Sequence, residues 1–162
     1  MITLIPMEEN EFDTFFEDNI VRYAEEIVRS GRWQQHEALE KSRASFEGFL
    51  PNGLQSKDQF IFNIFDEEQD LKIGILWVEV KMDEPHRPAF IFDFVIDEPY
   101  RGKGFGKKSL TALDEKLKQM GAESVALHVF GYNTTAFELY KKMGYEVTNI
   151  NMRKVYEQEG LP

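Results

Sequence analysis

The chain has 162 residues, of which 42% are hydrophobic and 30% charged, and its formal net charge is −10. This charge repels nucleic acids and anionic lipids and attracts small cations such as amines, so it argues against a nucleic-acid or membrane partner. Because the chain has no cysteine and only three scattered histidines, a covalent thioester on the protein is excluded and no metal site is predicted. We expect one domain over residues 1–162 and a cytoplasmic location, since no targeting segment is recognisable.

The first half of the chain predicts a short strand, two helices and then two strands. The strand is expected at residues 3–5, and apolar residues at every third or fourth position predict a helix over residues 8–28. A second helix is predicted over residues 35–50. Segments rich in Phe, Ile and Val then predict strands over residues 59–65 and 72–80, joined by an acidic hairpin loop.

The second half alternates strands with helices. A strand over residues 89–96 leads through a glycine-rich segment to a helix over residues 104–120. A strand over residues 124–130, a helix over residues 134–143 and one or two strands within residues 145–156 complete the chain. The predicted fold class is therefore α+β, with a central mixed, twisted sheet flanked by helices.

The segment that joins the strand over residues 89–96 to the next helix is rich in glycine and basic residues. Glycines let several backbone N–H groups point toward one place, and the N-terminus of a helix attracts anions. The added positive charges suit a phosphate-rich ligand. The residues of this predicted site are Arg101, Gly102, Lys103, Gly104, Phe105, Gly106 and Lys107.

The common nucleotide-binding motifs do not fit this segment. A P-loop would require glycine at Arg101 and Ser or Thr at Lys108, and the dinucleotide fingerprint would require a glycine at Lys107. The spacing that fits is [RQ]-x-x-G-x-G, which Arg101, Gly104 and Gly106 satisfy. On this motif alone, a glycine-rich turn without a ligand remains the alternative.

A second motif covers residues 133–145, which read Asn-Thr-Thr-Ala-Phe-Glu-Leu-Tyr-Lys-Lys-Met-Gly-Tyr. It fills every specified position of N-x-x-A-x-x-L-Y-x-x-x-G-[FY]. The two motifs, in this order, resemble the signatures of the GNAT N-acetyltransferase family, and the resemblance extends over residues 72–156. It implies the GNAT acyltransferase fold and acetyl-CoA as the acetyl donor.

The resemblance also implies how the cofactor would bind. Acetyl-CoA would lie in a splay between the strands over residues 89–96 and 124–130, with its pantetheine arm along Phe94, Val95 and Ile96. The N–H groups of the glycine-rich segment would hold the pyrophosphate, and Asn133 would contact the cofactor arm.

Tyr140 is the implied general acid toward the thiolate of CoA. A tyrosine with a pKa of about 10 is protonated at neutral pH and can donate to a thiolate whose conjugate acid has a pKa of roughly 8.5. Without the motif, core packing would be the ordinary interpretation of a tyrosine on an amphipathic helix.

The acceptor amine must lose a proton before it attacks, and the resemblance names no single base. Asp93 interrupts an otherwise apolar strand and is similar to an acidic position in amino-sugar members of the family; the alternative is a carboxylate satisfied by neighbouring donors. Glu79 is a second catalytic candidate, and its alternative is a solvent-facing strand end. His128 is interpreted as structural, while Tyr23 and Trp33 are candidates to border the acceptor pocket, together with two arginines, Arg22 and Arg32.

The sequence thus predicts an acetyl-CoA-dependent N-acetyltransferase that transfers acetyl directly to a primary amine of a small-molecule or peptide acceptor. A non-catalytic CoA-binding sensor or scaffold of the same fold, and an acyltransferase that uses another acyl-CoA, are the alternatives. The protein is expected as a monomer or a homodimer, the latter formed through a strand over residues 149–156, because exposed strand edges favour pairing.

Overall fold

The computed structural model describes residues 1–158. Two short 3₁₀ turns, Gly53–Gln55 and Glu98–Tyr100, accompany the regular elements. Those elements are, in chain order, β1 (Ile2–Pro6), α1 (Glu9–Arg29), α2 (Gln35–Phe49), β2 (Gln59–Asp66), β3 (Leu71–Val80), β4 (Ala89–Ile96), α3 (Phe105–Gln119), β5 (Val125–Leu127) and α4 (Thr134–Lys142).

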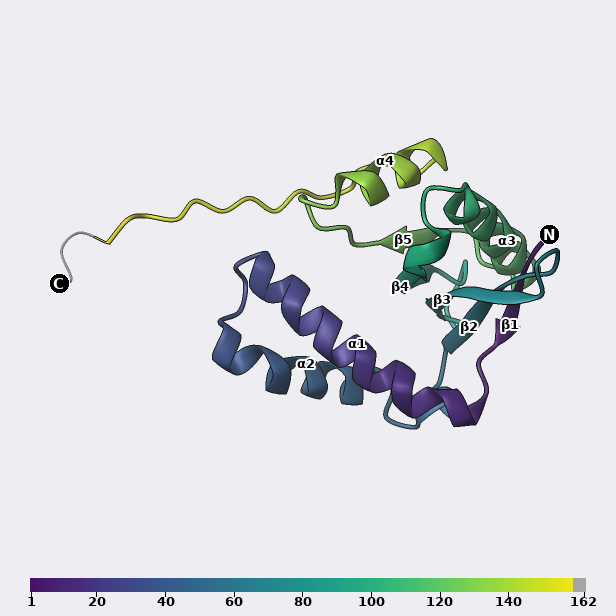
Figure 1. The fold of residues 1–162 in the computed structure, drawn as a ribbon, viewed down its shortest axis with the longest axis horizontal. Coiled ribbons are helices and arrows are strands. Elements are labelled where there is room, and N and C mark those ends of the chain that lie inside the picture. The colour runs from purple at the N-terminus through teal and green to yellow at the C-terminus, as the bar shows by residue number, and fades with distance from the viewer. Residues whose placement is uncertain (159–162) are drawn as a thin grey trace.

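The five strands form one sheet in the order β1-β2-β3-β4-β5, in which the first three pairs are antiparallel and β4 and β5 are parallel. Helices α1 and α2 lie on one side of this sheet, and α3 and α4 lie on the other (Figure 1). The parallel pair follows from the helical crossover α3 between its strands. The predicted α+β class with a mixed sheet between helices is confirmed.

Each face of the sheet has its own apolar core. On the α1–α2 side an aromatic group forms around Trp77, with Phe15 6.0 Å and Phe46 5.6 Å away between ring centroids. On the other side, Leu110 and Leu113 of α3 are fully buried against β2, β3 and β4. Helix α1 begins with a capping box between Glu8 and Glu11, which bonds otherwise unpaired N–H groups of its first turn.

Strand β4 contains a bulge at Phe92. Trp77 of β3 pairs with Asp93 and the next residue, Val78, pairs with Ile91, so Phe92 has no partner in the register. Consecutive residues of a regular strand point to opposite faces. Here Phe92 stacks on Trp77 at 4.7 Å while Asp93 bonds to Arg22 of α1, so the bulge turns both side chains toward the α1–α2 side.

The C-terminal part of the chain differs from the sequence prediction. Strand β5 is limited to Val125–Leu127 rather than residues 124–130, and the strands predicted within residues 145–156 are wrong, because residues 145–158 form neither strand nor helix. Instead this segment runs away from the rest of the molecule (Figure 1). Apolar and β-branched residues favour a strand, but a strand forms only where another strand supplies its hydrogen bonds, and within one described chain none does. Within residues 1–158, no helix is both long and apolar enough to cross a membrane.

Candidate active site

Strands β4 and β5 are paired only at one end. The register joins Ala89, Phe90 and Ile91 to the three residues of β5, and beyond this point no strand of residues 1–158 lies beside residues 92–96 on the β5 side. The two strands therefore separate as the sequence resemblance implied. Backbone groups along an open strand side can bind an extended ligand as if it were another strand.

The open part of β4 leads directly to the N-terminus of α3. Gly104 caps this helix in the left-handed conformation, at φ 82°, and no side chain among the described residues caps it. Gly102 also has a positive φ, 72°, which favours glycine at both positions. The N–H groups of the first helical turn have no carbonyl partner within the helix, so they are available to an anion.

The predicted phosphate-binding residues other than the glycines divide into three kinds. Arg101 uses its own N–H to bond Glu98 and its Nε to bond the carbonyl of Ile96 at 2.7 Å, so it shapes the loop. The side chain of Phe105 is buried in the core and leaves only its backbone for a ligand. Lys103 and Lys107 are exposed and bring positive charge to the helix N-terminus.

Gly106 brings α3 close to α4. A Cβ atom at this position would lie 2.9 Å from Cδ2 of Leu139. Helix α4 begins at Asn133, whose Oδ1 accepts a hydrogen bond from the N–H of Ala136 at 3.3 Å. This bond uses the Asn133 oxygen as a helix cap, and the predicted contact of Asn133 with the cofactor stays a prediction.

Tyr140 lies about two helical turns after Asn133 and therefore on the same side of α4. Its ring is half-buried and packs 5.5 Å from the ring of Tyr145. Burial first, and then the negative charge of Asp93, raise the pKa of Tyr140 to about 12. The hydroxyl is thus protonated at neutral pH.

Asp93 forms an ion pair with Arg22 of α1, at 2.5 Å between Oδ2 and Nη2. Arg22 also donates to Oδ1 of the buried Asn19, whose own amide donates to the carbonyl of Phe15. Burial raises the pKa of the Asp93 carboxyl, and Arg22 opposes this effect only in part. The structure thus supplies the neighbouring donor considered in the alternative, while it keeps the carboxyl on the side of the sheet that faces α1.

A hollow of about 460 Å³ lies beside this ion pair, between α1 and the loop before α4. Burial, and to a lesser extent the Asp93 charge, raises the pKa of Glu26 in its wall. Arg29 lies over the ring of Tyr132 at 3.9 Å. The hollow is lined by Arg22, Glu25, Glu26, Arg29, Tyr132 and Asn133.

Sequence reasoning missed Glu25, Glu26, Arg29 and Tyr132 as lining residues. A signal was present on α1, where Asn19, Arg22, Glu26 and Arg29 follow one another at helical spacing. They form a polar stripe beside the apolar face of the helix. Of this stripe, the sequence analysis named only Arg22.

Glu79 lies in a different setting from Asp93. It accepts a hydrogen bond from Gln59 Nε2 at 2.7 Å and pairs with Lys81 at 3.5 Å, while Gln59 accepts from the Trp77 indole. Among residues 1–158 no hydrogen bond joins Glu79 to Asp93 or Tyr140. Its catalytic role stays a prediction, and its contacts stabilise the end of the β2–β3 pair.

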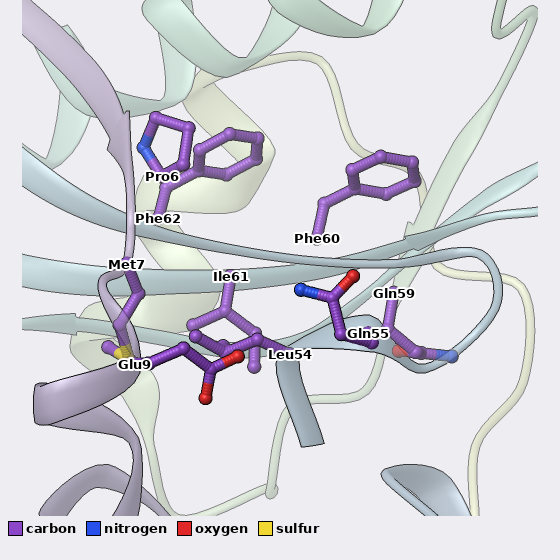
Figure 2. Close-up of a pocket in the computed structure, with 9 residues that line it drawn as sticks. All are labelled: Pro6, Met7, Glu9, Leu54, Gln55, Gln59, Phe60, Ile61 and Phe62. Carbon is purple, nitrogen blue, oxygen red and sulfur yellow. The ribbon is translucent and has the colours of Figure 1, made fainter. Parts of the chain in front are cut away.

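A smaller hollow of about 250 Å³ lies near Gln59, where β1, the start of α1 and β2 meet (Figure 2). Phe60 and Phe62 point to one side of β2 there, and Ile61 points to the other (Figure 2). None of the predicted catalytic or cofactor-binding residues lines it. This hollow therefore has no part in the site described above.

The remaining candidates are mostly packing residues. Tyr23 contacts Trp33 at 5.8 Å and Phe46 at 5.6 Å, so its ring belongs to the interface between α1 and α2. His128 lies edge-on to Phe130 at 4.8 Å. Partial burial and the nearby charge of Arg32 lower the pKa of His128, which keeps the imidazole neutral at pH 7.

Comparison with known proteins places this geometry in a family. A model described as the acetyltransferase (GNAT) family matches residues 20–145. YdgE of Bacillus subtilis (strain 168), which is named as an N-acetyltransferase, is 41% identical over 152 residues, or 94% of this chain and 96% of its own. YycN of the same strain, also named as an N-acetyltransferase, is 38% identical over 153 residues, or 94% and 97%.

Solved structures agree with the sequence comparison. The crystal structure of YycN from Bacillus subtilis superposes with a TM-score of 0.93 at 37% identity, over 98% of this chain and all of that one. AAC(6')-Iy, solved with the bisubstrate analog CoA-S-monomethyl-acetylneamine, superposes with a TM-score of 0.61 at 14% identity, over 98% and 99%, and shows the common fold alone. The chain belongs to the GNAT acetyltransferase family and is an acetyl-transferring enzyme.

Proposed function

We propose that the protein is an N-acetyltransferase that moves the acetyl group of acetyl-CoA directly to a primary amine in a ternary complex. One observation carries this proposal. The open side of β4 leads through the glycine-rich segment to the N-terminus of α3, which no side chain among the described residues caps, and Tyr140 packs against the core on the α3–α4 side of the sheet. The chain has no cysteine, so an acetyl thioester on the protein is excluded, and this supports a direct transfer.

The residues around the open strand suit acetyl-CoA. The backbone of Phe94, Val95 and Ile96 would bind the extended pantetheine arm, and the first-turn N–H groups of α3 would bind the pyrophosphate. Lys103 and Lys107 are exposed and would offset part of the phosphate charge. When bound, acetyl-CoA supplies the acetyl group as a thioester with an electrophilic carbonyl carbon.

We infer that the hydroxyl of Tyr140 donates a hydrogen bond to the sulfur of CoA as CoA leaves. In the protein without ligand, the pKa of the Tyr140 hydroxyl is about 12. A thiol has a pKa of roughly 8.5, so complete transfer of the tyrosine proton to the thiolate is unfavourable at these values. A hydrogen bond from the hydroxyl needs no such transfer and lowers the free energy of the developing thiolate. Tyr140 would give up its proton only as the sulfur becomes buried beside it.

We place the acceptor amine in the hollow between α1 and the loop before α4. Glu25 and Glu26 offer carboxylate oxygens to a protonated amine, although Arg22 and Arg29 line the same hollow and balance their charge. Arg22 connects the hollow to Asp93, its ion-pair partner. A carboxylate whose pKa is raised is a stronger base than an ordinary aspartate, and burial raises the pKa of Asp93. We therefore assign Asp93 as the general base, oriented by Arg22. The cytoplasmic location expected from the sequence stays a prediction.

The test measures free CoA with a thiol-reactive dye while the protein is mixed with acetyl-CoA and a panel of amines. The enzyme itself does not react with the dye, because the chain has no cysteine. We expect release that depends on one class of amine and falls about 100-fold in Tyr140→Phe, since hydrogen-bond donors of this kind contribute about that much.

Tyr145→Phe is the matched control. Its hydroxyl is buried and has no hydrogen-bond partner among the described residues, so its loss should leave the rate within about 2-fold of the wild type. Equal rates for Tyr140→Phe and the wild type would remove Tyr140 from the mechanism. Binding of acetyl-CoA without turnover on any amine would favour a CoA sensor, and turnover only with propionyl- or succinyl-CoA would favour another acyl donor.

A further inference from the structure

The hollow between α1 and the loop before α4 carries charges of both signs. Its four charged lining residues all come from α1: Arg22, Glu25, Glu26 and Arg29. The whole chain is acidic, with 29 acidic and 19 basic residues, so two arginines in one hollow are a local exception to its charge. An arginine in the wall repels an acceptor that carries positive charge alone. The two arginines therefore indicate an acceptor that also brings negative charge.

One of these arginines is engaged within the protein and the other is not. Arg22 forms the ion pair with Asp93. The side chain of Arg29 has neither an ion pair nor a hydrogen bond within residues 1–158, and its guanidinium lies 3.9 Å from the centroid of the Tyr132 ring. Stacking on an aromatic ring orients a guanidinium and leaves the N–H groups at its edge available, and these match the two oxygens of a carboxylate. Arg29 is thus oriented to bind a carboxylate from a ligand.

Glu26 is the complementary group in the same wall. Its side chain is half-buried, and burial raises the pKa of its carboxyl. Glu26 lies three residues before Arg29, a spacing at which helical ion pairs form, yet the part of the chain that the structure describes contains no ion pair between them. A carboxylate that has lost part of its water and has no ionic partner is stabilised by a cationic ligand. Glu26 therefore suits an ammonium group.

The order of these groups along α1 sets the spacing of the ligand. Arg22, Glu26 and Arg29 follow one another at steps of four and three residues and so share one side of the helix. Two helical turns separate Arg22 from Arg29, which is about 10 Å along the axis. Asp93, the proposed base, lies at the Arg22 end. The reacting amine is therefore expected at one end of the hollow, an ammonium group near Glu26 and a carboxylate at the far end.

We propose that the acceptor is a free amino acid whose side chain ends in a primary amine, as in lysine. Arg29 binds its α-carboxylate, Glu26 binds its α-ammonium group, and the side-chain amine reaches Asp93. The α-amine of an ordinary amino acid is joined to its carboxylate through a single carbon atom and is too close to it to reach both ends, whereas an amine on a long flexible stem spans them. This inference rests on the proposed function and names the substrate class of the same site.

The transfer with this acceptor follows the chemistry already described. Asp93 removes one proton from the side-chain ammonium group, and the amine nitrogen then forms a bond to the acetyl carbon as the C–S bond breaks. The second proton passes to the solvent. CoA leaves as the thiolate, which accepts a hydrogen bond from Tyr140, and the products are the side-chain amide and free CoA.

The first experiment compares three acceptors that differ by one group, through kcat/KM for CoA release. L-Lysine carries every group, cadaverine lacks the carboxylate, and ε-aminocaproate lacks the α-amine. We expect kcat/KM for lysine to exceed that for each of the other two by at least about tenfold, because each lost group leaves one charged residue of the wall without its partner. Mass spectrometry of the product should place the acetyl group on the side-chain nitrogen. Equal use of lysine and cadaverine, or acetylation of the α-nitrogen, would overturn the proposal.

Two variants test which residue recognises which group. Arg29→Gln should remove most of the preference for lysine over cadaverine and keep the preference over ε-aminocaproate, and Glu26→Gln should do the reverse. A loss of stability cannot produce this crossed pattern, because it lowers all three rates together. Arg43→Gln is the matched control, since Arg43 pairs with Glu17 and does not line the hollow, so both preferences should persist. Unchanged preferences in Arg29→Gln would overturn the carboxylate site.

A binding measurement separates the failure of this inference from the failure of the proposed function. Calorimetry titrates L-lysine into the protein with excess CoA, which has no acetyl group to transfer. We expect lysine to bind, and to bind at least about tenfold more weakly in Arg29→Gln. CoA release with other amines but no lysine binding would leave the acetyltransferase intact and overturn this inference. Lysine binding that depends on Arg29, without CoA release from acetyl-CoA, would keep the binding site and remove the proposed function.

Discussion

The region from β1 to α3 and the region that follows it are packed in different ways. In the first region every strand and helix contributes side chains to a core on one of the two faces of the sheet, and Trp77, Leu110 and Leu113 are almost completely buried. In the second region β5 has three residues and α4 has no buried side chain. The loosely packed region nonetheless carries Asn133 and Tyr140. The difference teaches that the proposed site combines two kinds of support: Asp93 and the phosphate-binding segment belong to the tightly packed region, whereas Tyr140 comes from a loosely packed helix.

The largest effect should come from truncating the same kind of side chain in the two regions. Leu113→Ala removes a fully buried side chain of α3 and should lower the free energy of unfolding by about 3 kcal/mol. Leu139→Ala, on the partly exposed α4, should lower it by about 1 kcal/mol. Urea denaturation followed by circular dichroism measures both. Equal losses would show that the second region is as tightly packed as the first.

A smaller effect is expected at Asp93, where the two regions meet. Its folded pKa is raised above the ordinary 3.8, mainly by burial, so the folded state binds its proton more tightly than the unfolded state does. This contribution to stability is fully present below pH 3.8 and is lost as the pH rises through the folded pKa.

Asp93→Asn removes this titration. The wild type should therefore lose stability relative to Asp93→Asn as the pH rises above about 3.8 and through the raised folded pKa. Thermal unfolding at a series of pH values tests this, and parallel curves for the two proteins would contradict it. In the same variant, the rise of kcat/KM with pH that a general base produces should disappear.

The smallest effects concern two helical glycines. Gly106 lies where α3 of the first region meets α4, and a Cβ there would approach Leu139 to 2.9 Å, against the flexible end of that side chain. Gly106→Ala should shift α4 slightly and raise the KM for acetyl-CoA several-fold. Gly48 on α2 has no atom within 4 Å of such a Cβ, so Gly48→Ala should stabilise the protein by about 0.5–1 kcal/mol and leave KM unchanged. Equal KM values for acetyl-CoA in both variants would show that the contact between α3 and α4 does not affect how acetyl-CoA binds.

Much of the first region could be predicted from the sequence, because its signals are local. Strand β4 was predicted at residues 89–96, as observed, and the helical periods of α1, α2 and α3 placed these elements within one or two residues. The glycine-rich segment was also correctly placed between a strand and a helix. These features depend on side-chain periodicity and on turn residues, which a sequence carries directly.

Features that depend on pairing could not be predicted. The bulge at Phe92 exists only in relation to the register with β3, and the ion pair of Asp93 with Arg22 needs α1 to cross that strand. The strand predicted around Ile150 has a suitable composition, yet in the described chain this segment pairs with no strand. The hollow beside α1 was missed because its walls come from segments about a hundred residues apart.

The bulge at Phe92 also bears on how such an enzyme can change its acceptor. An extra residue in one strand takes up a change of register locally, so the part of β4 before Asp93 can vary while the part from Phe94 to Ile96 keeps its position. One strand thus serves as two independently adjustable surfaces, one for the amine and one for the acyl donor. We expect differences in acceptor preference among related sequences to concentrate at residues 90–93 and on α1, with residues 94–96 left unaltered.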